Sequence, residues 1–370
     1  MARGLHDCRY GIRRPNLRET NSPAVPMASP SLLAAPASLP PGKRPVSLFR
    51  YDSTDVHEYC ANLPGWSLDY DQLSTGPFRG SLTTIELPRL DIFREVTTRK
   101  LRQSGTLGAD SFTIGIPWHA SSIARCNGTT LSGADTFLLN IDGEIELYTP
   151  DDFELRGISA GASLMERLAA ELGIGWPPHF LRRLLAVGVD AGRMARFRCL
   201  LCAAATAVPA GPTDGVGTPA IRALEDGLLL AILDLVASGQ PIGRPGTAAR
   251  KRTVDRARDL MLSLDGKAMT LLDICRQVGV SPRKLTYCFQ EQLGISPAHF
   301  WKAIRLNRAR KDLLAPTAGR GEIYDIATRH GFWHFSQFSQ DYKRHFLERP
   351  SDTVAKARPR RVAEAAAVRQ

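Results

Sequence analysis

The sequence contains no long hydrophobic run and few cysteines. Its best candidate for a membrane helix, residues 224–236, is interrupted by Glu225, Asp226 and Asp234, whereas a spanning helix needs about 18 or more apolar residues with little charge. Seven cysteines in 370 residues are an odd and modest number, which argues against a small secreted domain held by disulfides. We therefore expect a cytoplasmic protein that does not enter a membrane.

Catalytic motifs are also missing. The sequence has neither a glycine-rich phosphate-binding loop nor a nucleophile elbow. Cys199 and Cys202 form a C-x-x-C without a second pair, and His57 and His119 lack the companions of a cupin metal site, so ordinary cysteines and histidines are the better interpretation. We expect no catalytic residues, no metal and no required cofactor. A cupin-type enzyme fused to a helical DNA-binding module and a sequence-indifferent architectural DNA binder stay open as alternatives.

The net charge of +11 is distributed unevenly along the chain. Residues 241–370 contain 25 lysines and arginines against 12 acidic residues, a net charge of +13, whereas residues 47–240 have a net charge of −7. Clustered lysine and arginine attract a polyanion because they displace its counterions. The charge pattern therefore predicts that the C-terminal third binds nucleic acid and that the middle of the chain does not.

Composition divides the chain into five parts. Residues 1–46 are rich in proline and residues 356–370 in arginine and alanine, so we expect a disordered tail at each end. Translation could start at Met1 or at Met27. Between the tails we expect a first domain at 47–240, a linker at 241–252 and a second domain at 253–355.

The first domain has short β-type runs followed by helix-type runs, which predicts an α+β protein. The expected strands are 81–87, 92–98, 112–116, 122–126, 136–141, 144–148 and 153–159. The expected helices are 162–172, 178–185, 192–207 and 219–238. Short strands at regular spacing favour a cupin-like β-barrel, followed by dimerisation helices.

An apolar stripe on the last of these helices bears on the oligomeric state. Leu224, Leu228, Ala231 and Leu235 recur at helical spacing within 219–238. We interpret the stripe as the seam of a homodimer, with packing inside one subunit as a nearly equal alternative.

The second domain contains an internal repeat. Asp273, Ile274 and Gly279 recur 52 residues later as Asp325, Ile326 and Gly331. Each copy has the pattern of a helix-turn-helix motif, with a glycine where the first helix ends. A long helix at 298–314 separates the copies and could hold them at the spacing of successive major grooves, roughly 34 Å.

The second helix of each copy leaves polar side chains outside its apolar stripe. These are hydrogen-bonding types suited to base edges and phosphates. In the first copy they are Arg283, Lys284, Thr286 and Tyr287, and in the second they are Ser336, Gln337, Gln340 and Lys343. The repeat and the charge together predict binding to double-stranded DNA.

The same region contains the motifs Asp273-Ile-Cys, Gly-Ile-Ser-Pro at 294–297, Arg305-Leu-Asn-Arg-Ala-Arg310 and Gly331-Phe-Trp-His-Phe-Ser-Gln-Phe338. Through these motifs, residues 253–353 resemble the DNA-binding domain of the AraC/XylS family of transcription regulators. The resemblance implies an all-α domain with two helix-turn-helix motifs joined by a long helix. It also implies that 282–292 and 335–344 are the reading helices, that Phe335 is a further reader, and that RNA polymerase is a partner.

The first domain is similar to the effector-binding and dimerisation domain of that family. Thr54-Asp-Val, Phe93-Arg-Glu95, Gly115-Ile-Pro117 and Thr149-Pro-Asp-Asp152 resemble activators of ethanolamine-utilisation operons. That likeness implies ethanolamine and adenosylcobalamin as effectors. Aromatic and charged residues on the expected strands or at their ends are the candidates for the effector site, namely Phe93, Arg94, Arg99, Phe112 and Trp118.

Overall fold

The computed structural model describes residues 45–119, 123–126, 129–131, 135–141, 143–176, 185–207, 219–242, 247–264, 269–315 and 320–357. They belong to one compact unit, residues 38–370. Most of both expected tails, Met1 and Met27, part of the expected linker (243–246) and most of the expected helix 178–185 lie outside the described residues. Leu185 itself begins a strand.

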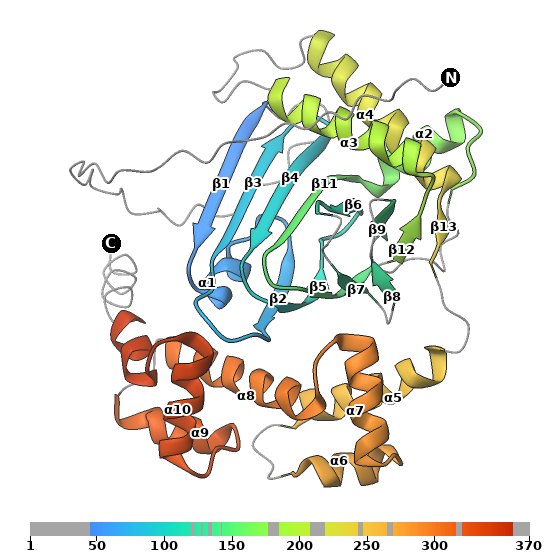
Figure 1. Ribbon diagram of the computed structural model, residues 1–370. Helices are drawn as coiled ribbons and strands as arrows, with labels where there is room; N and C mark the ends of the chain where they lie inside the picture. Colours follow the sequence, from blue (N-terminus) through green and yellow to red (C-terminus); the bar gives the residue numbers. More distant parts are fainter. Residues whose placement is uncertain are drawn as a thin grey trace, which may run out of the picture. The chain divides into compact units, whose positions relative to one another are not determined.

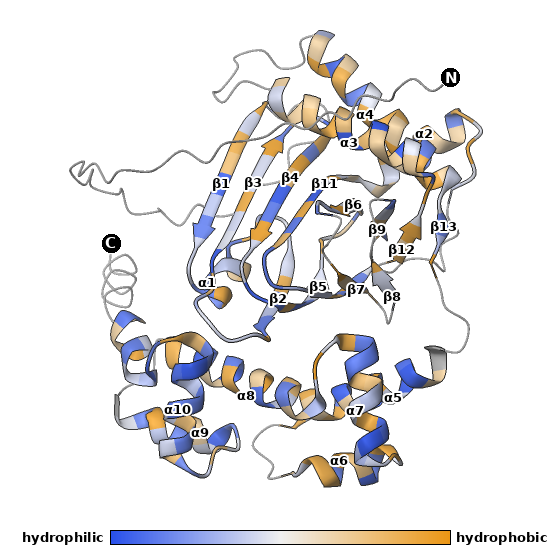
Figure 2. Ribbon diagram, in the orientation of Figure 1, coloured by the Kyte–Doolittle hydropathy of each residue, from blue (hydrophilic) through white to orange (hydrophobic). Residues whose placement is uncertain are grey.

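The first domain contains an eight-stranded antiparallel sheet. Its spatial order is β1 (Ser47–Ser53), β3 (Gly80–Glu86), β4 (Leu90–Thr97), β11 (Phe153–Gly161), β6 (Ser111–Pro117), β9 (Thr136–Ile141), β12 (Leu185–Gly188) and β13 (Gln240–Pro241) (Figure 1). Strand β4 contains both hydrophobic and hydrophilic residues (Figure 2), in the order Leu90-Asp-Ile-Phe-Arg-Glu-Val-Thr97. Successive side chains of a strand point to opposite sides, so the sheet has two different faces.

A second, five-stranded sheet packs against it. Its order is β2 (Ser67–Gln72), β5 (Leu101–Thr106), β10 (Glu144–Thr149), β7 (Ala124–Cys126) and β8 (Thr129–Leu131), and a short helix, α1 (Val56–Ala61), precedes β2. Both sheets are open over the described part of the chain, so the closed cupin-like barrel that we predicted is replaced by two stacked sheets. Strands β1, β2 and β5 were not expected, because their many polar residues and Gly105 hide the strand pattern.

Each face of the large sheet buries a separate core. Neighbouring residues on β4 show the division, since Ile92 enters the core under the helices and Phe93 enters the core between the sheets. The helices over the outer face are α2 (Ala162–Glu171), α3 (Ala191–Ala207) and α4 (Pro219–Ser238) (Figure 1). All of the helices within the described residues are too short or too polar to cross a bilayer.

Helix α4 packs its apolar stripe inside the subunit. Leu228 and Leu235 are 0% and 1% exposed and belong to the core under α2 and α3. Glu225 is buried in the same helix, where its carboxylate accepts hydrogen bonds from the backbone and side chain of Arg89. The interpretation of this stripe as a dimer seam was therefore wrong at these leucines, because the sheet already covers them.

The second domain is entirely helical among its described residues. It comprises α5 (Thr247–Ser263), α6 (Leu271–Val278), α7 (Pro282–Leu293), α8 (Pro297–Leu314), the 3₁₀ turn η2 (Arg320–Glu322), α9 (Ile323–Arg329) and α10 (Phe335–Phe346). Helix α8 belongs to two cores, contributing Trp301 and Ile304 to the one with α6 and α7, and Leu306 and Leu313 to the one with α9 and α10. One helix thus holds both repeats.

Candidate DNA-binding site

Local sequence fixes the turn of the first helix-turn-helix module, which we define as α6 and α7. A capping box between Thr270 and Asp273 begins α6, and Gly279 ends it with φ of 74°, a conformation that glycine adopts at little cost. Ser281 then accepts a hydrogen bond from the backbone N–H of Lys284 at 3.2 Å, with Pro282 in the first turn of α7. These signals set where α7 starts and which side it buries.

Helix α7 presents the polar side chains that we predicted to read DNA. Leu285 and Phe289 are fully buried, which turns the opposite side of the helix to solvent. The hydroxyl of Thr286 donates to the carbonyl of Pro282 at 2.9 Å, so its oxygen is left as an acceptor. The exposed set is Arg283, Lys284, Thr286 and Tyr287, all on the outer side of α7.

The second module, α9 and α10, has a similar helix-turn-helix arrangement, but different contacts stabilise its turn. Gly331 follows α9 with φ of 76°. Arg305 of α8 donates to the carbonyl of Gly331 at 3.1 Å, and its guanidinium lies over the rings of Trp301 and Phe332 at 4.7 and 4.8 Å. His334 precedes α10 without a side-chain capping bond. The turn of the second module is therefore stabilised by Arg305, which is distant in sequence, whereas the turn of the first module is stabilised by side-chain caps nearby in sequence.

Helix α10 exposes amides, a hydroxyl and an aromatic edge. Phe338 and Tyr342 are fully buried, and α10 is predominantly hydrophilic along its length (Figure 2). The predicted readers that it exposes are Phe335, Ser336, Gln337, Gln340 and Lys343. All nine predicted DNA-reading residues thus lie exposed on α7 or α10, and their contact with DNA stays a prediction.

Three exposed aromatic residues lie around the start of α10. Trp333, Tyr324 and Phe335 are 57%, 56% and 41% exposed, and the rings of Tyr324 and Phe335 are 6.1 Å apart. Our sequence analysis did not select Tyr324. Tyr324 corresponds in the repeat to Leu272, 52 residues earlier, and both are exposed large hydrophobic residues.

The basic residues of α8 mainly form hydrogen bonds and ion pairs within the protein. Arg308 donates to the carbonyls of Leu262, in the last turn of α5, and of Leu264, just after it. Arg310 is 7% exposed, and its guanidinium pairs with Asp55 of the first domain at 2.7 Å and with Glu348 at 2.6 Å. Burial alone would raise the pKa of Asp55, but Arg310 and the hydrogen bonds around the carboxylate outweigh it and lower that pKa.

Strand β2 is hydrogen-bonded to α8 as well. The side chain of Asn307, fully buried, accepts from the backbone N–H of Gln72 at 3.0 Å and donates to its carbonyl at 2.8 Å. His345 of α10 bonds the same carbonyl at 2.9 Å through Nε2. Burial lowers the pKa of His345 to about 4, so this ring is neutral at physiological pH and donates its proton to the carbonyl.

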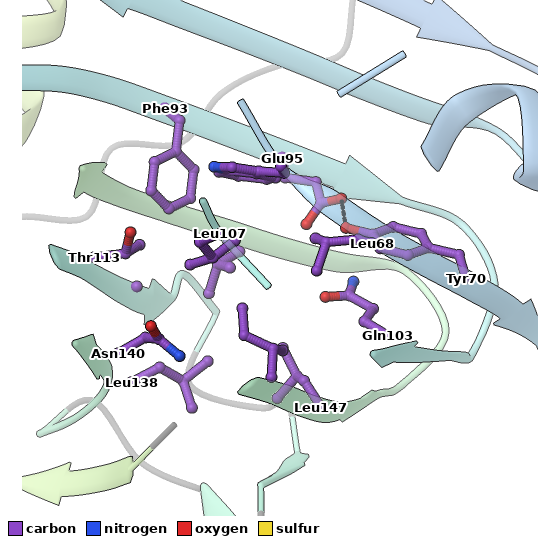
Figure 3. Close-up of a pocket in the computed structure, with 14 residues that line it drawn as sticks. Leu68, Tyr70, Phe93, Glu95, Gln103, Leu107, Thr113, Leu138, Asn140 and Leu147 are labelled. Carbon is purple, nitrogen blue, oxygen red and sulfur yellow. Dashed lines mark hydrogen bonds between the residues drawn. The ribbon is translucent and has the colours of Figure 1, made fainter. Parts of the chain in front are cut away.

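A cavity of about 40 Å³ lies between the two sheets of the first domain. Of the five predicted effector-site residues, Phe93 lines it (Figure 3). Arg94 pairs with Glu154 at 2.8 Å and Arg99 donates to the carbonyls of Pro77 and Thr75, outside the cavity. Phe112 lies in the core under the helices, and Trp118 packs beneath the guanidinium of Arg156. The structure thus does not bring these five residues together.

The polar group that the structure adds to this cavity is Glu95. It is 2% exposed, accepts a hydrogen bond from the hydroxyl of Tyr70 at 2.9 Å, and lies among Leu68, Leu147 and other apolar side chains (Figure 3). Burial raises the pKa of Glu95 to about 7. Glu95 follows Phe93 by two residues on β4, so the alternation of the strand was a usable signal for a carboxylate that points inward.

Comparison with known proteins places the helical domain. A helix-turn-helix domain family matches residues 274–356. The chain is 34% identical over 139 residues to the probable thc operon regulatory protein of Rhodococcus erythropolis, over 38% of this chain and 41% of that protein. It is 35% identical over 75 residues to the XylDLEGF operon transcriptional activator of Pseudomonas putida, over 20% of this chain and 23% of that protein.

A solved structure adds to these likenesses. It is a transcriptional regulator with an AraC-type DNA-binding domain from Chromobacterium violaceum, 31% identical, covering 30% of this chain and 96% of that one with a TM-score of 0.27. The chain spans less than half the length of either curated relative named above. The family match establishes that the C-terminal part of this chain contains a helix-turn-helix domain, and the curated relatives that it resembles are regulators of transcription.

Proposed function

We propose that the whole chain is a sequence-specific transcription activator that responds to a small molecule and works in the cytoplasm with RNA polymerase. The observation that carries the proposal is the pair of exposed polar helices, α7 and α10, mounted on one shared helix, α8. A single exposed polar helix is common, whereas two in tandem would suit successive major grooves on one face of a duplex.

The two helices would read different features of DNA. Arg283 on α7 has the bidentate donors that recognise guanine, and Lys284 is suited to phosphate. On α10, Gln337 and Gln340 carry amides suited to adenine, and the exposed ring of Phe335 is suited to a thymine methyl group. Recognition would therefore be basic in the first groove and amide-rich and aromatic in the second.

The first domain would bind the effector in the cavity between its sheets. Ethanolamine, which the sequence resemblance implies, is small enough for a cavity of about 40 Å³. Adenosylcobalamin is far larger than this cavity, so its candidacy as a second effector rests on the resemblance alone. A homodimer is part of the proposal, with its interface away from the buried side of α4.

Strand β2 provides a direct path from the cavity to the DNA-reading helices. Tyr70 bonds Glu95 in the cavity, and Gln72, two residues later, is bonded by Asn307 of α8 and His345 of α10. A ligand changes DNA binding only if it binds one arrangement of the protein better than another. A ligand that moves Tyr70 would shift β2 and with it the mounting of both modules.

Binding of the full chain to DNA tests the proposal. We expect the chain to select a specific duplex from a random pool and to lose roughly 10³-fold or more in affinity between 50 and 200 mM salt. Arg283→Ala should alter the selected sequence, whereas Arg196→Ala, a matched change at an exposed arginine of α3, should not. Equal affinity for unrelated duplexes would instead indicate an architectural binder.

Transcription of a reporter from the selected site, with purified RNA polymerase, tests activation separately. We expect output to rise when the chain is added and to change with the effector. A drop in output on addition of the chain would make it a repressor and contradict the activator assignment.

A further inference from the structure

The cavity between the sheets contains a carboxylate without a cation. Glu95 is 2% exposed, and over the described residues no lysine, arginine or histidine forms an ion pair with it. Its carboxylate accepts a hydrogen bond from the hydroxyl of Tyr70 at 2.9 Å, and the polar groups of Tyr59 and Gln103 also lie beside it. A buried carboxylate is costly unless it is paired or protonated, so this site gains from any ligand that brings a positive charge.

A second polar group in the cavity is also without a partner. The amide nitrogen of Gln103 is buried and makes no hydrogen bond, although it lies close to Glu95 (Figure 3). Asn140, in contrast, is satisfied, since its amide bonds both the carbonyl and the N–H of Gly143. Glu95 and Gln103 therefore present a carboxylate and an amide group side by side at the cavity.

The other residues that line the cavity are mostly apolar, and together with the cavity volume they limit the size and polarity of a ligand. Trp66 and Phe93 meet edge to face with ring centroids 5.3 Å apart, and aromatic faces attract cations. Leucines 68, 107, 147 and 155 supply apolar contact. A volume of 40 Å³ is room for about three water molecules, so a ligand has only a few non-hydrogen atoms.

We propose that this cavity binds a small organic ammonium ion, whose charged nitrogen is held by the Glu95 carboxylate and whose short apolar body packs on Trp66 and Phe93. The inference deepens the proposed function by naming the chemical class of the effector, and rests on it only for the effector's regulatory role. The carboxylate selects a cation over a neutral or anionic molecule of the same shape. A hydroxyl on the ligand would accept a hydrogen bond from the side-chain amide of Gln103.

Calorimetry on the full chain tests the ligand class with three molecules of one shape: propylammonium, propan-1-ol and propanoate. We expect propylammonium alone to bind, with one site per chain. Glu95→Gln keeps the shape and removes the charge, and we expect it to weaken propylammonium binding at least tenfold. Glu144→Gln, the same change at an exposed position of β10, should leave binding unchanged and serves as the matched control.

Each contrary result has a defined meaning. Binding of propan-1-ol as tight as that of propylammonium, unchanged binding in Glu95→Gln, or no binding of any ammonium from methylammonium to butylammonium would overturn the proposal. Thermal unfolding of Glu95→Gln verifies that this variant is folded. DNA selection by the same samples separates the outcomes, because loss of ligand binding with intact DNA selection refutes the ammonium site and leaves the DNA-binding function standing.

Discussion

The two helix-turn-helix modules share one repeat but are stabilised in different ways. The first uses caps that are close in sequence, with Thr270, Asp273 and Ser281 bonding backbone within three residues. The second lacks side-chain caps at the start of α9 and α10 and depends on distant groups, including Arg305 at Gly331 and the bond from His345 to Gln72. The difference shows that the same helix-turn-helix fold can be stabilised by caps nearby in sequence in the first module and by tertiary contacts in the second.

That contrast has a consequence for regulation. Contacts with β2 reach α10 through His345 and α8 through Asn307. Helix α10 of the second module is therefore bonded directly to the strand that lines the cavity. We expect changes in the first domain to be felt more strongly there than on α7.

The largest effect on stability should come from truncating one buried phenylalanine in each of the two helical cores. Phe289→Ala and Phe338→Ala each remove a fully buried ring, and each should cost about 3–5 kcal/mol of stability. Because the rings belong to different cores, hydrogen exchange should quicken mainly in α5–α7 for the first variant and in α9–α10 for the second. Equal loss of protection in both modules by either variant would show that they unfold as one.

Acid should weaken the second module more than the first. The folded pKa of His345 is lowered to about 4, so the unfolded chain takes up the proton first, and this stabilisation, complete above pH about 6.5, is lost as the pH falls toward 4. The full loss is on the order of 3 kcal/mol. Urea unfolding at pH 7.5 and pH 5 should show a smaller pH effect in His345→Asn than in the parent, and an identical one would refute the assignment.

Base recognition should separate the two reading helices. Arg283→Ala and Gln337→Ala should each cost about 1–3 kcal/mol and relax specificity at different positions of the site. Lys343→Ala is the control for phosphate contact and should weaken all sequences alike while lowering the salt slope by about 1. Competition binding against a set of single-base variants measures all three. A uniform loss for Arg283→Ala would remove it from the readers.

The smallest effect concerns the caps themselves. Ser281→Ala removes the hydrogen bond that caps α7 and should cost about 1 kcal/mol. His334→Ala changes the corresponding residue of α10, which makes no capping bond, and should alter stability by less than about 0.5 kcal/mol. Denaturant midpoints of the free protein measure both. Similar losses in the two variants would end the distinction between local and tertiary stabilisation.

The helical domain was largely predictable because its signals are local. Gly279, Gly331 and the Ser281-Pro282 pair lie within a few residues of the turns that they form, and the apolar spacing separated buried Phe289 and Phe338 from the exposed readers. The same spacing led us to place Leu228 in a dimer interface, whereas it packs inside the subunit. An apolar stripe indicates that a side chain is buried but does not indicate which surface buries it.

The first domain and its site were less predictable because they depend on distant pairs. Gln72 and Asn307 are 235 residues apart, and Arg310 reads as a solvent-exposed cation until Asp55 is placed beside it. Glu95 becomes a candidate only when β2 and β5 supply Tyr70 and Gln103. No local pattern contains that pairing.

Selection of binding sites by the full chain from a randomised duplex pool tests the central claim most directly. Two reading helices on one face of DNA predict an enriched sequence with two conserved blocks whose centres lie about 10 base pairs apart, repeated if the chain is a dimer. Arg283→Ala should blur one block and Gln337→Ala the other. A pool without enrichment, or one block affected by both variants, would contradict the account.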